Sequence, residues 1–131
     1  IKQFMDNAAK EARETGRVST LLGRTRRMDE INSSNFLIRS RAERASYNMP
    51  VQGSASDIIK LAMINTFNEL RNKNMKTKLI MQVHDELILD APKEEASLAC
   101  EIIRRNMSSA LKLLVPLDVD STVSYRWSDG H

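Results

Sequence analysis

Residues 79–90 read Leu79-Ile80-Met81-Gln82-Val83-His84-Asp85-Glu86-Leu87-Ile88-Leu89-Asp90, an apolar segment interrupted by three adjacent polar residues. Strict alternation would place Asp85 on the same face as Val83 and Leu87, where burying a carboxylate is costly. We therefore predict two short strands joined by a tight turn that presents His84, Asp85 and Glu86. Carboxylates on a rigid turn suit Mg²⁺, which prefers oxygen ligands in fixed geometry. An ordinary solvated turn is the alternative, because polar turns between apolar strands are common.

The composition restricts the class of protein. A chain of 131 residues fits one domain, and its 41% hydrophobic and 5% aromatic content predicts an aliphatic core. The single cysteine, Cys100, excludes a disulfide framework and falls in an apolar helical pattern, so we expect it to be buried. No segment has the length and apolarity of a membrane span or a signal peptide. The start at Ile1 favours a piece of a longer protein.

Positive charge is concentrated in the first part of the chain. Residues 1–47 contain 10 Lys and Arg against 6 Asp and Glu, whereas residues 48–131 contain 10 against 11. Arginine suits phosphate contacts because its planar guanidinium matches phosphate oxygens. An ordinary solvated surface with ion pairs explains the charge equally well. The arginines of the first part are Arg13, Arg17, Arg24, Arg26, Arg27, Arg39, Arg41 and Arg44.

Before residues 79–90, the pattern predicts mainly helices. A helix over residues 2–15 ends at Gly16, and a strand and a basic turn follow within residues 17–27. Residues 32–35 form a loop and a helix cap. The next helix covers 35–47, and Met49-Pro50 interrupts it because proline removes a donor. Ser54-Ala55-Ser56-Asp57 then resembles a capping box that opens a helix ending near Asn74.

After the hairpin, we expect a helix over residues 93–111 and a closing strand over residues 115–123, where apolar and polar residues alternate. The predicted fold class is α+β, with an antiparallel sheet of hairpin and closing strand backed by helices.

Arg44, Asn48 and Gln52 are spaced four residues apart. If the helix continues through Pro50, all three project from one face. Amide and guanidinium donors on such a face could contact the minor groove, where every correct base pair offers acceptors at nearly the same place. They would sense pairing geometry without reading sequence. The alternative is that Asn48 and Gln52 satisfy backbone groups freed around Pro50.

Two blocks together carry a resemblance to a known family. Residues 44–60 and the motif Gln82-Val83-His84-Asp85-Glu86 closely resemble, in order and separation, two blocks of the family A DNA polymerases of the bacterial DNA polymerase I type. Further matches cover nearly the whole chain: Leu22-Gly23-Arg24, Ser33-Ser34-Asn35, Ala42-Glu43-Arg44-Ala45, Trp127 and His131.

The resemblance implies a C-terminal segment of a template-directed DNA polymerase, with primed template DNA, dNTP and the rest of the polymerase domain as partners. Residues 1–35 would belong to the fingers, as a helical and hairpin piece, and residues 36–131 to the C-terminal half of a palm-type sheet. Asp85 would hold the catalytic Mg²⁺ pair together with a second carboxylate upstream of this chain, and Glu86 would tune that site. His84 would approach the primer terminus.

The same resemblance assigns DNA contacts to residues of the first part. Asn48 and Gln52, helped by Arg44, would contact the minor groove, and Arg24 would contact the primer or template backbone. The family's first aspartate motif and its nucleotide-binding helix have no match here, so we expect the chain alone to be inactive. The location would be the cytoplasm (nucleoid) for a bacterial or phage protein, or an organelle for a eukaryotic one.

Two other classes of function stay open. One is a non-catalytic nucleic-acid-binding module derived from a polymerase palm, although the His84-Asp85-Glu86 triplet argues against it. The other is a metal-dependent nuclease, which would need further acids near the turn. Asp90, Asp118 and Asp120 are the candidates for that role, and a solvated face explains the last two better.

Overall fold

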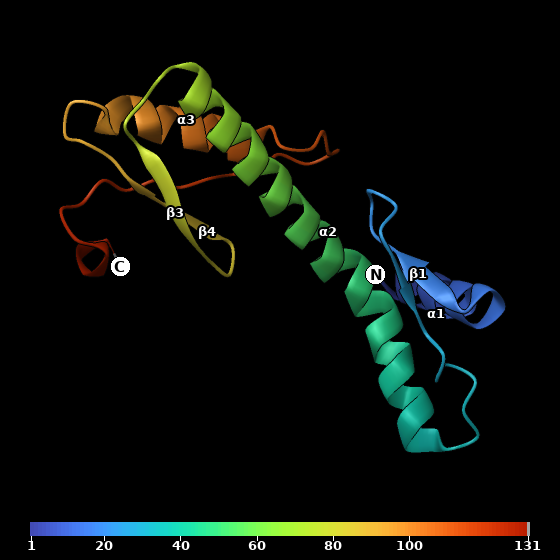
Figure 1. Ribbon diagram of the computed structural model, residues 1–131. Coiled ribbons are helices and arrows are strands. Elements are labelled where there is room, and N and C mark those ends of the chain that lie inside the picture. The colour runs from blue at the N-terminus through green and yellow to red at the C-terminus, as the bar shows by residue number, and fades with distance from the viewer. Residues whose placement is uncertain (131) are drawn as a thin grey trace. The chain divides into compact units, whose positions relative to one another are not determined.

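The computed structural model describes residues 1–130, which form an α+β chain of three α-helices, two antiparallel hairpins and a short C-terminal 3₁₀ turn (Figure 1). The chain divides into two compact units: the first is Ile1–Asp57, and the second begins at Ile58. The long helix α2 (Phe36–Asn72) contributes residues to both units. Each unit therefore has its own packing, and each contains one of the two sets of predicted site residues.

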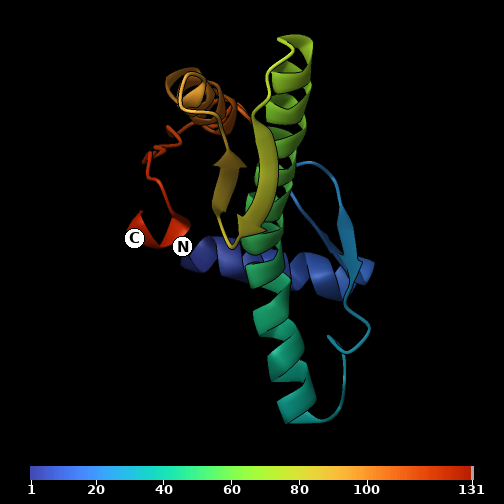
Figure 2. The same ribbon diagram turned by 60° about the vertical axis from the view of Figure 1, so that its left-hand side comes forward.

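The first unit is built on helix α1 (Lys2–Thr15) and the hairpin of β1 (Arg17–Ser19) and β2 (Thr25–Arg27). Helix α1 ends as predicted at Gly16, whose φ of 69° is a left-handed conformation that glycine adopts without a Cβ penalty. The chain then turns back so that β1 runs beside α1 (Figures 1 and 2). The core of this unit joins residues of α1, the hairpin, the following loop and α2: Ala12, Val18, Met28, Ile31, Ala42 and Met49.

Helix α2 corrects the prediction of a break at Met49-Pro50. It is a single helix of 37 residues that runs through Pro50, and Ser54-Ala55-Ser56-Asp57 lies inside it rather than capping a new helix. The helix persists because burial holds it in place: Met49 lies in the core, and Ser46 is fully buried. The other predicted cap, within residues 32–35, is confirmed at the start of α2, where the side-chain oxygen of Asn35 accepts the Leu37 N–H at 2.9 Å.

The second unit contains the predicted hairpin, formed by β3 (Lys78–Val83) and β4 (Glu86–Asp90) (Figure 2). Val83 pairs with Glu86, so His84 and Asp85 alone form the turn. A register shift between Leu79 and Met81 marks a β-bulge at Ile80. The turn takes Asp85 out of the paired strands and so breaks the strict alternation that would have buried it.

Helix α3 (Ala96–Ser108) is shorter than the predicted span of residues 93–111. At its C-terminus the Arg105 carbonyl accepts the Ser109 N–H at 3.0 Å and also the hydroxyls of Ser108 and Ser109, at 3.2 and 2.7 Å. Glu69 of α2 connects the two helices by pairing with Arg105 and accepting from the Asn106 amide at 3.1 Å. Buried apolar residues lie on both helices: Ala62 and Leu70 on α2, and Ala99, Ile102 and Ile103 on α3.

The predicted closing strand over residues 115–123 is wrong. These residues have no regular secondary structure, and within the described part of the chain the second sheet consists of β3 and β4 alone. Side chains expected to alternate between core and solvent are largely exposed, including Val115 at 65% and Val123 at 63%. A strand needs a neighbour to pair its backbone groups, and alternation by itself does not supply one.

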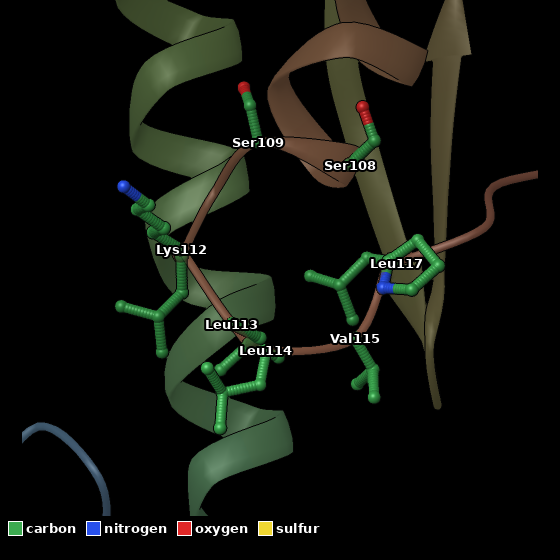
Figure 3. A pocket seen from close by; sticks show the side chains of 9 residues that line it. Ser108, Ser109, Lys112, Leu113, Leu114, Val115 and Leu117 are labelled. Carbon is green, nitrogen blue, oxygen red and sulfur yellow. The ribbon is translucent and has the colours of Figure 1, made fainter.

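The segment after α3 lines an open concavity of about 360 Å³ (Figure 3). Its lining residues carry no acid or histidine: Ser108, Ser109, Leu111, Lys112, Leu113, Leu114, Val115, Pro116 and Leu117. This concavity therefore offers no carboxylate to a metal ion, unlike the turn of the hairpin.

The predicted boundary at residue 35 separates regions of a polymerase fold, whereas the packing units meet between residues 57 and 58. The two divisions describe different properties, so the boundary at residue 35 stays a prediction.

Within residues 1–130, no helix combines the length and the apolarity that crossing a bilayer requires.

Candidate metal-binding turn and nucleic-acid-binding helix face

The hairpin turn presents its three polar side chains to solvent. His84, Asp85 and Glu86 are all exposed, and they lie at or beside the two turn positions. His84 has a φ of 53°, in the left-handed region that a tight turn requires and that non-glycine residues adopt only at a cost. The Gln82 amide donates to the His84 carbonyl at 3.0 Å and so ties the turn to β3. The local sequence thus holds two adjacent carboxylates in a defined position.

The oxygen ligands of this turn are of the kind that Mg²⁺ prefers, but they are too few to form a complete site. No cluster of three or more His, Cys, Asp or Glu side chains that could hold a metal ion occurs among residues 1–130. Asp90, Asp118 and Asp120 therefore do not complete a metal site with Asp85. Two adjacent carboxylates could supply only part of the oxygen ligands that a Mg²⁺ ion needs.

The predicted stripe of Arg44, Asn48 and Gln52 lies in the uninterrupted part of α2, in the first unit. All three side chains are exposed. The face that packs into the core is offset from them by one or more residues and includes Ala42, partly buried Ala45 and Met49. Because α2 continues through Pro50, residues at four-residue intervals share one side of the helix. The stripe is thus available to a partner from outside this unit.

Arg24 has a different environment. Its Nε donates to Asp57 Oδ1 at 2.8 Å, and its Nη2 donates to the Gly53 carbonyl at 3.1 Å. The Arg24 side chain remains 48% exposed, whereas that of Asp57 is only 9% exposed. The predicted contact between Arg24 and the DNA backbone stays a prediction.

Sequence reasoning missed the contacts of Gly53, Ser54 and Asp57, and it treated Ser54-Ala55-Ser56-Asp57 as a helix start. In the structure these residues are the part of α2 that contacts the connection between β1 and β2. A signal was present in Gly53, since glycine inside a helix is unfavourable unless a close approach needs it. A methyl group at Gly53 would lie 2.7 Å from Thr20 Cγ2, closer than Cβ atoms approach other atoms.

Comparison with known proteins gives the family. The sequence model described as DNA polymerase family A matches residues 1–129, and the chain belongs to this family. It is 49% identical over 130 residues to DNA polymerase I of Geobacillus stearothermophilus and 46% identical over 130 residues to that of Bacillus subtilis (strain 168). In each case 99% of this chain and 15% of the relative are covered.

A solved structure agrees with this assignment. The POL domain of Pol1 from M. smegmatis, in complex with DNA primer-template and dNTP, is similar with a TM-score of 0.87 and 39% identity. The match covers 89% of this chain and 21% of that chain. The chain thus spans about one seventh of the length of its curated relatives, and it represents one part of the polymerase fold.

Proposed function

We propose that this chain is a C-terminal fingers and palm segment of a template-directed DNA polymerase, which transfers nucleotides from dNTP to a primer 3′-OH. The observation that carries the proposal is the hairpin turn with exposed Asp85 and Glu86, within a chain that matches the family over residues 1–129. The similar M. smegmatis domain holds primer-template and dNTP, which supports the same ligands here.

In this proposal Asp85 is one of the two carboxylates that hold the Mg²⁺ pair, and Glu86 tunes the site. The second carboxylate comes from another part of the polymerase domain. When bound, the two ions would activate the primer oxygen and stabilise the leaving pyrophosphate. The contribution of this chain is a rigid two-residue turn that fixes where one carboxylate lies, and His84 is placed beside it to meet the primer terminus.

The exposed stripe of α2 supplies the duplex contact. Asn48 and Gln52 donate to minor-groove acceptors near the nascent pair, and Arg44 contacts the same duplex from the same face. These donors recognise correct geometry in any base pair, which suits a polymerase that copies every sequence.

The test is primer extension by the full-length polymerase carrying Asp85→Asn. Asparagine keeps the size of the side chain but removes its charge, so a metal ligand would be weakened. We expect extension to fall by about 10³-fold or more, as for loss of a central group in a catalytic unit. Affinity for primed duplex should stay within about threefold of wild type, because most of the affinity comes from phosphate contacts elsewhere.

Asp90→Asn is the matched control, since Asp90 is an exposed acid at the far end of the same strand from the turn. It should leave extension near wild type. An Asp85→Asn enzyme that extends primers normally would refute the assignment of Asp85 and favour a nucleic-acid-binding module without its own chemistry.

A further inference from the structure

The connection between β1 and β2 is fastened to a single turn of α2 that begins directly after Gln52. The Leu21 N–H donates to Ser54 Oγ at 2.9 Å. Arg24 reaches the same turn through its hydrogen bond to the Gly53 carbonyl and its ion pair with Asp57. We refer to the contacts of Arg24 with Gly53 and Asp57 as the Arg24 clamp.

The connection is itself well ordered by local hydrogen bonds. The Thr20 hydroxyl accepts the Arg24 N–H at 3.1 Å, and the Thr20 N–H donates to the Arg24 carbonyl at 2.9 Å. Thr20 is only 5% exposed because it lies against Gly53, whose missing side chain leaves room for the methyl group. The position of Arg24 is therefore set on both sides, by its own turn and by α2.

This part of α2 has weak helix-forming elements of its own. Pro50 has no N–H, so the Ser46 carbonyl loses the donor that residue 50 would otherwise supply. Gly53 adds backbone freedom, and the Ser54 hydroxyl donates to the Pro50 carbonyl in competition with the helix backbone. Asn48 and Gln52 lie within this segment. Their orientation consequently depends on support from outside the helix.

We propose that the Arg24 clamp is a positioning device that holds Asn48 and Gln52 in the orientation needed for duplex recognition. Arg24 acts through α2 and not by contacting phosphate itself. The inference rests on the proposed function, because it assigns the cause of the orientation of the same DNA-contacting residues.

Charge and geometry both favour positioning over a phosphate contact. Two of the nitrogen atoms of the Arg24 guanidinium point toward α2, at Asp57 and at the Gly53 carbonyl. The Asp57 carboxylate neutralises the arginine, and its side chain is largely buried. A neutral pair releases few counterions when DNA binds, so it adds little to phosphate affinity.

The first experiment compares Arg24→Gln, Asp57→Asn and Gln52→Ala in the full-length polymerase. Extension is measured from matched and from mismatched primer termini, and affinity for primed duplex is measured as a function of salt. If Arg24 positions α2, all three variants should lose about tenfold or more in extension from mismatched termini relative to matched ones, as expected for the loss of one or two hydrogen bonds at the recognition surface. The salt dependence of binding should stay at the wild-type slope.

A direct phosphate contact gives a different result. Arg24→Gln would then reduce the salt slope by about 0.9, the value for one phosphate contact, while Asp57→Asn would behave like wild type. That pair of results would overturn the proposal. Arg26→Gln is the matched control for loss of one exposed arginine from the same hairpin.

A second pair of variants tests the close approach without changing charge. Gly53→Ala should reproduce the mismatch defect, because the new methyl group would lie 2.7 Å from Thr20 Cγ2 and 3.3 Å from Arg24 Nη2. Thr20→Ser removes the threonine methyl group and keeps the hydroxyl that accepts from Arg24, so the double variant Gly53→Ala, Thr20→Ser should recover most of the extension; only the contact with the end of the Arg24 side chain remains. A Gly53→Ala enzyme with a wild-type matched-to-mismatched ratio would contradict the proposal.

Amide hydrogen exchange separates failure of the clamp from failure of the proposed function. In Arg24→Gln and Asp57→Asn, amides of residues 46–57 should exchange about tenfold faster, matching loss of one charge-assisted hydrogen bond. Unchanged exchange there would overturn the clamp whatever the activity. A wild-type polymerase with no template-directed extension would overturn the proposed function, and the exchange result would still decide whether the clamp supports α2.

Discussion

His84 shows how a single residue sets the geometry of the proposed metal-binding turn. Its left-handed φ of 53° costs about 1 kcal/mol or more for a residue with a Cβ, and the turn recovers part of this cost through the hydrogen bond from Gln82. The result is a two-residue turn between paired strands, and this short turn restricts the backbone position of Asp85. A longer loop would present the same side chains with less definition.

At the same scale, Gln52 gives a sharp prediction for the full-length polymerase. Gln52→Ala should slow extension from mismatched termini by about tenfold relative to matched ones, because one recognition hydrogen bond is worth about 1 kcal/mol or slightly more. Single-turnover extension from paired and mispaired primers measures the ratio. Gln3→Ala is the control, since Gln3 is an exposed glutamine of α1. An unchanged ratio in Gln52→Ala would count against minor-groove contact.

At the scale of elements, Glu95 connects the start of α3 to the segment after α2. Its carboxylate accepts the backbone N–H groups of Lys76 and Thr77 at 3.0 and 2.9 Å, and the Thr77 hydroxyl at 2.6 Å. The Thr77 hydroxyl, together with these N–H groups, holds the pKa of the Glu95 carboxyl below its usual value. Glu69 has a lowered pKa for a similar reason, chiefly its hydrogen bond from Arg105.

These lowered pKa values predict how stability depends on pH. Each carboxylate binds protons less readily in the folded chain than in the unfolded chain, so its stabilisation is present above the ordinary pKa of 4.5 and is lost as the pH falls through the lower folded value. Glu95→Gln should flatten this acid-dependent loss. Urea unfolding between about pH 3 and pH 7 measures it. Glu94→Gln, at the exposed neighbour, is the control, and an equal effect of both variants would contradict the assignment.

The elements also show what the sequence could predict. The hairpin, α1 with its Gly16 end and the Asn35 cap follow from local patterns, and each is confirmed. The break at Pro50 is wrong because tertiary burial of Ser46 and Met49 outweighs one lost hydrogen bond. The hydrogen bonds from Leu21 to Ser54 and from Arg24 to Asp57 each join residues 33 positions apart. Local patterns carry no information about such pairs.

The candidate site divides in the same way. The exposure of Asp85 and Glu86 follows from the predicted turn and that of Asn48 and Gln52 from helix spacing, and the structure agrees. The ion pair of Arg24 with Asp57 could not be predicted from the sequence, because a basic turn suggests phosphate binding as long as the partner carboxylate is unknown. The roles assigned to all these residues stay proposals.

At the scale of the whole molecule, the proposed function assigns only part of a site to this chain, and many apolar side chains of the chain are exposed. Leu114 and Tyr125 are 106% and 92% exposed, and the chain spans 15% of the length of its relative in Geobacillus stearothermophilus. A single carboxylate turn does not fix two Mg²⁺ ions, which otherwise keep their water ligands. Positioning of the triphosphate, which accounts for most of the catalysis in this chemistry, needs further residues.

We therefore expect the 131-residue chain alone to give no detectable primer extension with dNTP and Mg²⁺. The assay uses a primed template, with the full-length polymerase as the positive control and the Asp85→Asn chain as the negative control. Extension by the chain that disappears in Asp85→Asn would show that it completes a metal site by itself. The chain would then hold a complete site rather than a partial one.

The two-residue turn also restricts how this segment can change its length. Because side chains alternate along β4, one inserted or deleted residue at positions 84–85 would require a less well-defined loop, a new bulge or a rotation of the whole strand. Rotation would exchange the outward and inward sides of Leu87, Ile88 and Leu89 at once. Point substitutions can therefore accumulate around this hairpin, whereas insertions and deletions are expected to be absent from functional variants. A library of length variants should retain function only where the original spacing between Val83 and Glu86 is kept.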